Sequence, residues 1–288
     1  MTEAGAKPSE ALKGEDWAGE MGERWLANLD RLEAMIHPIG SAAIDRAGFQ
    51  EGERVLEIGC GGGATTFAIA DLVGASGEVV GVDVAPMLVD VARRRAAEQN
   101  ALNVCFICAD AGSVTLEEAP FDRLFSRFGS MFFEEPIPAF ANLHSLLRSG
   151  ARIDLCVWGP PRDNLWMMEM MGVVRKHVDI PPAEPRAPGP FAFEDVGYLR
   201  EVLAGGGFSE IEIEAYEAGQ PIGGPGTQPE EAVRFVLSSL GVGRVLAEQE
   251  AHIQERASAD LKALFERHYV ADKGIIMACK AWLVSAIS

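Results

Sequence analysis

Residues 55–63 read VLEIGCGGG, and this stretch decides the fold that we expect. A short apolar run from Arg54 to Ile58 ends in a glycine-rich turn, and a helical segment from Ala64 to Val73 follows at once. Glycines let the backbone turn tightly and let a ligand approach without meeting a side chain. The first amides of the following helix lack partners within the helix. The stretch therefore predicts a strand, a nucleotide-type binding turn and a helix, as in the first unit of a doubly wound sheet.

Apolar runs and helical segments continue to alternate up to residue 158. We expect further strands at 78–82, 104–107, 123–126 and 153–158, and helices at 86–98 and 136–148. Such alternation is typical of a parallel sheet with helices on both faces. Beyond it we expect a helix at 194–203, a half-exposed strand around 211–213, a long helix through 246–265 and a last strand at 274–286. The fold class is thus α/β, a Rossmann-like doubly wound sheet of seven strands with the last strand antiparallel.

The segments outside this alternation are expected to be helical. Residues 1–50 contain no expected strand, and an apolar stripe at helical spacing predicts a helix over 16–36, with a second one over 41–47. We interpret 1–50 as an N-terminal lid and 51–288 as the binding domain. Cap insertions are expected at about 160–192 and 217–272. Thr227 and Glu230 have the spacing of a capping box that begins a helix.

Composition narrows the class of partner. The formal net charge is −18, and a field of that sign repels nucleic acids and anionic lipids. The longest basic run, 93–95, lies on a helix that we interpret as surface. The five cysteines include one C-x-x-C pair, Cys105 and Cys108, without the second ligand pair that a zinc site needs, so we expect no metal. Neither a signal peptide nor a membrane span is recognisable, so we expect a cytoplasmic protein, and a homo-oligomer remains possible.

The glycine turn alone fits two cofactors. Gly59-x-Gly61-x-Gly63 matches the pattern for S-adenosylmethionine (SAM), and Gly59-x-Gly61-x-x-Ala64 matches the dinucleotide fingerprint. Asp83 ends the second expected strand, where a carboxylate can accept hydrogen bonds from the ribose hydroxyls of either cofactor.

Three other features favour SAM. Glu57 lies where it can receive an ammonium group, which SAM has and NAD lacks. Asp110 follows the third strand and can accept from an adenine amino group, although a turn-capping role is the alternative. The last two strands resemble a hairpin rather than a second dinucleotide-binding half. An NAD(P)-dependent oxidoreductase and a non-catalytic SAM-binding scaffold stay as alternatives.

Several motifs occur in an order that resembles one family. They are VLEIGCGGGATT, GVDVAPMLVDVA, ADA, FDRLFSRFGSMFFEEP and LLRSGARIDLCVW. The sequence resembles the Rossmann-fold SAM-dependent methyltransferases, in particular the branch grouped with the ubiquinone/menaquinone-biosynthesis C-methyltransferases. The resemblance covers residues 17–160 well, and 190–215 and 274–286 loosely. It departs at Ser149-Gly150-Ala151, where relatives usually carry Pro-Gly-Gly.

The resemblance implies a set of cofactor contacts. Glu57, Gly59 and Gly61 would hold the methionine part, and Ser126 and Phe128 would lie under it. Asp83 would hold the ribose. The residues implied around the adenine are Val84, Met87, Asp110 and Ala111. Trp17 and Trp25 resemble a lid motif, with ordinary helix packing as the alternative.

The acceptor side is less defined. Trp158 and Trp166 lie at or beyond the fifth strand, where such sheets bind ligands, and Trp166, beyond the strand, is the better candidate for a pocket. Arg127 ends the fourth strand and can clamp a carboxylate or phenolate, or form a structural ion pair. His37 and His177 are the histidines best placed to reach a pocket, but no residue is assigned as a catalytic base. We expect in-line transfer of a methyl group from SAM to a small, apolar or aromatic molecule.

Overall fold

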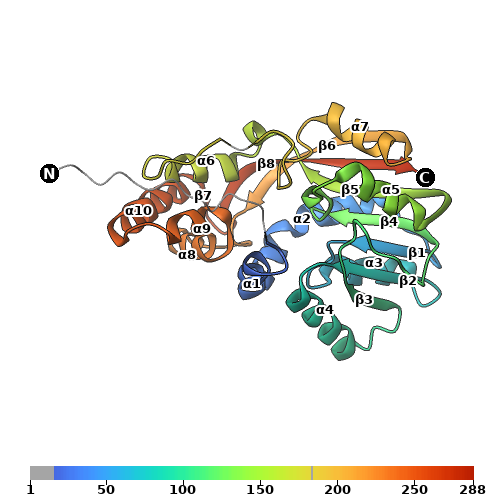
Figure 1. Cartoon of the computed structure of the whole chain (residues 1–288). Coiled ribbons are helices and arrows are strands. Elements are labelled where there is room, and N and C mark those ends of the chain that lie inside the picture. The colour runs from blue at the N-terminus through green and yellow to red at the C-terminus, as the bar shows by residue number, and fades with distance from the viewer. Residues whose placement is uncertain (1–15, 183) are drawn as a thin grey trace.

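The computed structural model describes residues 16–182 and 184–288, and its centre is one mixed sheet (Figure 1). The strands are β1 (Arg54–Ile58), β2 (Glu78–Asp83), β3 (Val104–Cys108), β4 (Phe121–Arg127), β5 (Leu147–Trp158), β6 (Ser209–Pro221), β7 (Tyr269–Val270) and β8 (Gly274–Ile287). Seven of them follow the order β3-β2-β1-β4-β5-β8-β6, and β7 pairs only with the start of β8. On this path β8 alone runs opposite in direction to the other six strands, so the predicted seven-stranded fold is confirmed, with β7 as a small addition.

Helices cover both faces of the sheet. Those of the sheet region are α2 (Leu29–Ala47), α3 (Ala64–Val73), α4 (Pro86–Gln99), α5 (Pro136–Ser145) and α7 (Val196–Gly205). The strand order steps one way from β1 to β3 and the other way from β4 to β5. Because parallel crossovers are right-handed, α3 and α4 lie on one face and α5 lies on the other. The carboxyl ends of β1, β2 and β4 therefore meet at one edge, beside the turns that begin these helices.

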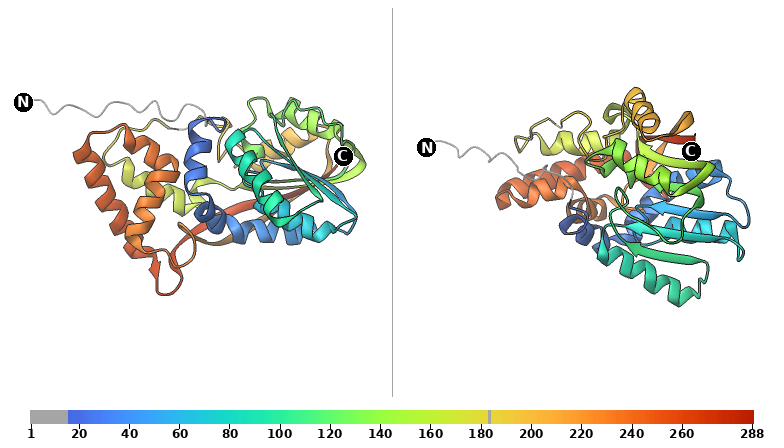
Figure 2. Two further views of the ribbon diagram at one scale, coloured as in Figure 1. Left: turned by 90° about the horizontal axis from the view of Figure 1, so that it is seen from below. Right: turned by 45° about the vertical axis from the view of Figure 1, so that its right-hand side comes forward.

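A helical cap stands beyond that edge. It consists of α6 (Leu165–Val174), α8 (Pro229–Ser239), α9 (Gly241–Ala247) and α10 (Ala251–His268). The paired strands β6 and β8 continue past the end of β5 to Pro221 and Ile276 and carry the cap away from the sheet (Figures 1 and 2). His268 pairs with Glu169 at 3.0 Å and so ties α10 to α6.

The first N-terminal helix lies between the cap and the sheet, and the second continues from it along one face of the sheet beside α3 (Figure 2). Helix α1 (Glu20–Ala27) ends at Asn28, and α2 then runs unbroken through Pro38 to Ala47. The two predicted helices at 16–36 and 41–47 were therefore wrongly divided. Pro38 removes one backbone hydrogen bond, but α2 buries a continuous apolar face that includes Ile39 and Ile44, and this packing maintains the helix.

Other predictions of local structure were also wrong. The capping box uses Gln228 and Glu231, one residue later than expected. The single long helix through 246–265 is two helices, α9 and α10. Helix α5 ends at Ser145 rather than 148 and strand β5 begins at Leu147 rather than 153, because the chain passes through Gly150 at a φ of +76° without leaving the strand. Among the helices of residues 16–182 and 184–288, none is long and apolar enough to cross a bilayer.

Candidate functional site

The glycine turn after β1 is shaped by two different constraints. At Gly59, with a φ of +71°, a Cβ atom would lie 2.6 Å from the Cα of Gly129, so the turn packs against the loop after β4. At Gly61, with a φ of +53°, a Cβ would meet no atom within 4 Å. Gly61 therefore presents bare backbone to open space at the edge where ligands of such sheets bind.

Asp83 holds this turn in place. One carboxylate oxygen accepts from the backbone N–H of Gly61 at 2.8 Å, and the other accepts from the N–H of Ala85 at 2.9 Å. Burial raises the pKa of Asp83, and these backbone hydrogen bonds oppose that rise. The predicted ribose-binding carboxylate thus lies next to the exposed backbone of Gly61.

Glu57 is buried beneath the turn. Its two carboxylate oxygens accept hydrogen bonds from the hydroxyls of Thr65 and Thr66, in the first turn of α3. Its side chain is fully inaccessible, and burial raises its pKa despite these bonds and the nearby Arg127. The carboxylate therefore fixes β1 to α3, and its reach toward a ligand ammonium stays a prediction.

The residues predicted around the adenine follow the carboxyl ends of β2 and β3 or lie in the first turn of α4. Val84 is 43% exposed, and the sulfur of Met87 would be 3.0 Å from a Cβ on Gly22. Asp110 accepts from the N–H of Gly112 at 2.8 Å, so it caps a turn, the alternative role that its sequence position left open. Ala111 is buried.

Aromatic side chains join the N-terminal segment to the loop after β4. The ring of Trp17 packs edge-on against Trp25 at 5.3 Å and against Phe132 at 5.2 Å between centroids. The Trp17 indole N–H is buried without a hydrogen-bond partner among the described residues. Since α1 also packs on α4 through Leu88, the predicted lid residues cover this edge of the sheet.

A second aromatic row leads from β4 into the cap. Phe128 stacks on Trp158 at 4.1 Å, and Trp158 contacts Trp166 at 5.2 Å. Trp158 and Trp166 are both nearly fully buried, and the indole N–H of Trp166 donates to Asn164. Ser126, also buried, donates its hydroxyl to the carbonyl of Ile58. Packing thus accounts for all four side chains as they lie here.

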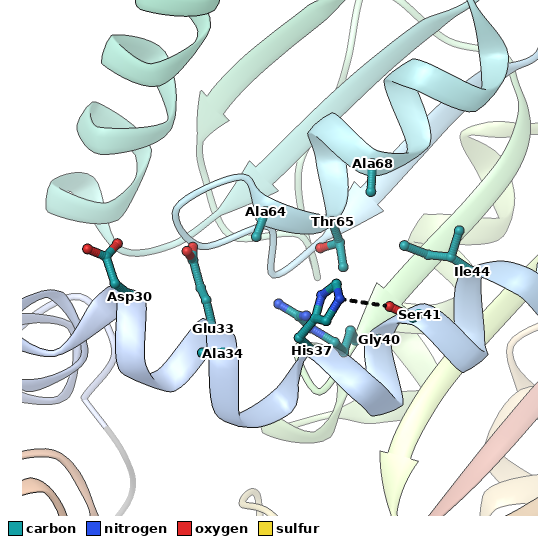
Figure 3. A pocket seen from close by; sticks show the side chains of 11 residues that line it. Asp30, Glu33, Ala34, His37, Gly40, Ser41, Ile44, Ala64, Thr65 and Ala68 are labelled. Atoms are coloured by element: carbon teal, nitrogen blue, oxygen red, sulfur yellow. Dashed lines mark hydrogen bonds between the residues drawn. The ribbon is translucent and has the colours of Figure 1, made fainter. Parts of the chain in front are cut away.

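A cavity of about 330 Å³ lies between α2 and α3, where Asp30, Glu33 and His37 face Ala64 and Thr65 (Figure 3). The remaining lining residues are Ala34, Gly40, Ser41, Ile44, Ala68 and Arg127. His37 therefore reaches a pocket, as predicted, and its ring lies 3.4 Å from the Ser41 hydroxyl. His177 instead pairs with Asp260 of α10 at 2.9 Å, within the cap.

Arg95 is a linking residue that our sequence analysis missed. The basic run on α4 is predicted to lie at the surface, but Arg95 is partly buried and donates to the carbonyl of Gly62 at 2.9 Å. It also pairs with Glu33 at 2.8 Å and Asp30 at 3.0 Å. The sequence pattern that could have indicated partners for Arg95 lies on α2, where residues 30, 33, 37 and 41 recur at helical spacing and form one polar face.

The comparisons with known proteins agree with this geometry. Residues 55–150, from β1 into β5, match the family model described as a methyltransferase domain. A probable cobalt-precorrin-6B C(15)-methyltransferase (decarboxylating) from Saccharolobus solfataricus is 32% identical over 145 residues, which is 49% of this chain and 71% of that protein. The chain belongs to the SAM-dependent methyltransferase family. The resemblance inferred from the motifs is thereby confirmed.

For other relatives in this family, the match covers a smaller share of the relative's own length. Aklanonic acid methyltransferase DauC from a Streptomyces species is 34% identical over 43% of this chain and 57% of its own length. Ubiquinone/menaquinone biosynthesis C-methyltransferase UbiE from Coxiella burnetii is 30% identical over 41% of this chain and 48% of its own. The chain thus spans about half the length of these curated relatives.

A solved structure shows the same fold. Phosphoethanolamine N-methyltransferase 2 from Haemonchus contortus, in complex with phosphomonomethylethanolamine and S-adenosylhomocysteine, gives a TM-score of 0.58. It is 17% identical, and the match covers 95% of this chain and 60% of that one. At this identity the likeness concerns the fold alone.

Proposed function

We propose that this protein transfers a methyl group from SAM to a small-molecule acceptor by in-line displacement. The main support is that the Asp83 carboxylate accepts a hydrogen bond from the backbone N–H of Gly61, whose backbone borders open space where β1 and β2 end. A carboxylate there suits ribose hydroxyls, and an open glycine suits a ligand that approaches the turn closely. The names of the relatives support this proposal, because aklanonic acid and cobalt-precorrin are small molecules.

When bound, SAM would supply a methyl group already activated on a positively charged sulfur. Asp83 would hold the ribose, Val84 and Met87 would border the adenine, and Asp110 would accept from its edge. Trp17 and Trp25 would exclude water, which strengthens the electrostatic interactions within a closed site. No side chain is assigned as a proton acceptor, because an acidic nucleophile needs none.

We also propose separate roles for the N-terminal lid and the cap. Residues 16–50, the described part of the predicted lid, would cover the cofactor, and residues 1–15 of that lid lie outside the described part of the chain. The cap segments at about 160–192 and 217–272 would enclose the acceptor. They could admit a molecule of modest size but not a nucleic acid duplex, which the net charge of −18 also disfavours.

Titration calorimetry with SAM and, separately, with NADH tests the cofactor. We expect SAM to bind and NADH to give no heat of binding. Binding of NADH alone would favour the oxidoreductase alternative, and SAM binding without turnover of any acceptor would favour the scaffold.

A further inference from the structure

The cavity between α2 and α3 contains a cation, Arg127, whose guanidinium has no hydrogen-bond or ion-pair partner among the described residues. The Arg127 side chain leaves the end of β4 and passes beside α2, where a Cβ on Gly40 would lie 2.7 Å from Nη1 and 3.1 Å from Cδ. Gly40 is inside a helix, where glycine lowers stability relative to alanine. Its absent side chain is what leaves room for the guanidinium, so the backbone of α2 is built around Arg127.

The other charged groups near the cavity are already engaged. Glu33 and Asp30 pair with Arg95, and Glu57 accepts from two threonine hydroxyls. Electrostatic interactions with Glu57, Cys156 and Glu33 favour the charged form of Arg127 and raise its pKa. Within residues 16–182 and 184–288, however, its guanidinium makes no hydrogen bond or ion pair. Burial lowers the pKa of Arg127, as expected for a charge taken out of water without close compensation.

We propose that this cavity is a carboxylate-binding site and that Arg127 is its ligand-binding cation. A guanidinium offers five N–H donors in a fixed fork that matches the two oxygens of a carboxylate. Ser41 and His37 add a hydroxyl and a ring nitrogen on the wall formed by α2. The proposal deepens the proposed function, because the cavity begins at Ala64 and Thr65, directly after the glycine turn.

The carboxylate could come from two sources. One is the amino-acid end of the cofactor, whose ammonium group would suit the acidic end of the cavity at Glu33 and Asp30. The other is an acid group on the acceptor. Both place the same chemistry on Arg127, and the ligands chosen below separate them.

Binding is measured by calorimetry for the wild type, Arg127→Met and Gly40→Ala. Gly40→Ala keeps the charge but moves the guanidinium, and it replaces a helix glycine by the best helix former, so it tests the site even if Arg127→Met folds poorly. Arg94→Met, an exposed arginine on α4, is the matched control. The ligands are S-adenosylhomocysteine and methylthioadenosine, which lacks the amino-acid end, and then 2-naphthoate and the uncharged 2-naphthamide.

If the carboxylate is the cofactor's, both site variants weaken S-adenosylhomocysteine binding by about ten- to hundred-fold, and methylthioadenosine binding changes less than about two-fold. If it is the acceptor's, S-adenosylhomocysteine binding is unchanged. The preference of the protein for 2-naphthoate over 2-naphthamide then falls by about ten-fold in both variants.

The proposal is overturned if neither ratio changes in the site variants, or if Arg94→Met changes them equally. A wild type that binds neither SAM nor S-adenosylhomocysteine would refute the proposed function instead. In that case the comparison of 2-naphthoate with 2-naphthamide alone tests the carboxylate-binding site.

Discussion

The carboxylate of Asp83 accepts a hydrogen bond from the backbone N–H of Gly61, 2.8 Å away, and thereby joins the end of β2 to the turn after β1. One side chain thus both shapes the glycine turn and faces the space beside it. Because the second oxygen accepts from Ala85, both oxygens already have a partner, and a ribose would use their remaining lone pairs.

We therefore expect Asp83→Ala to weaken SAM binding by about 2–3 kcal/mol, since the hydroxyls lose a charged acceptor and the turn loses its anchor. Asp83→Asn keeps one acceptor oxygen and should lose less. Calorimetric titration of SAM gives both values, and a circular dichroism spectrum checks the fold. An unchanged affinity in Asp83→Ala would remove Asp83 from the proposed site.

The N-terminal helices should become more protected when the cofactor binds. Helix α1 is held by a small apolar cluster with Leu29, Leu88 and Val91, and Trp17 has a buried N–H without a partner in the described part of the chain. Hydrogen exchange of residues 16–35 is compared with and without S-adenosylhomocysteine, with α7 on the opposite face as the internal control. Equal exchange in both states would mean that these helices are packed in the same way with and without the cofactor and do not act as a lid.

Glu57 should make stability depend on pH. Burial raises its pKa in the folded protein above its ordinary value of 4.5, so the folded state binds the proton more tightly than the unfolded state does. This contribution to stability is present at low pH and is lost as pH rises from about 4.5 through the raised pKa.

Glu57→Gln removes this titration and keeps a group that can bond with Thr65 and Thr66. The stability of the variant relative to the wild type should therefore rise between pH 5 and pH 7.5. Urea unfolding at both pH values measures the change. A relative stability that falls or stays constant over this range would contradict the buried placement of Glu57.

A buried ion network of β4 and β5, near the start of β4, should contribute to stability but not to SAM binding. Asp154 is 3% exposed and accepts from Arg123 at 2.7 Å and Arg152 at 2.6 Å, while Arg123 also donates to the carbonyl of Ala47 in α2. Asp154→Asn leaves Arg123 buried with a weaker counter-charge, so we expect a loss of about 3–5 kcal/mol.

Chemical unfolding measures this loss. The control is Glu230→Gln, which breaks an exposed ion pair with Lys262 and should change little. Equal effects of the two substitutions would show that the Asp154 network does not hold α2 to the sheet. SAM affinity should be unaffected in Asp154→Asn molecules that remain folded.

The sequence predicted the first four strands and the helices between them better than the elements around them. Strands β1 to β4 lie within two residues of their predicted positions, because each is a short apolar run between turn-forming residues. The continuity of α2 through Pro38 and the separation of α9 from α10 depend on tertiary packing, which local propensity does not contain.

The same limit applies to the site. Gly61 and Asp83 were found because their chemistry follows from their place at strand ends. Arg95 was missed because its partners, Glu33 and the carbonyl of Gly62, lie on segments far away in the sequence. The reason for Gly40 is likewise visible only once Arg127 passes beside it.

Methyl transfer itself is the most direct test of the account. Purified protein is incubated with SAM carrying a labelled methyl group and with a panel of phenolic, quinone, polyketide and heterocyclic acceptors. Parallel reactions contain tRNA or protein extract, and the Asp83→Ala protein serves as the control. We predict label in a small-molecule product together with S-adenosylhomocysteine, and strong loss of both with Asp83→Ala. Label confined to the tRNA or protein fractions would contradict the proposed acceptor class, and no S-adenosylhomocysteine with any acceptor would contradict the proposed methyl transfer.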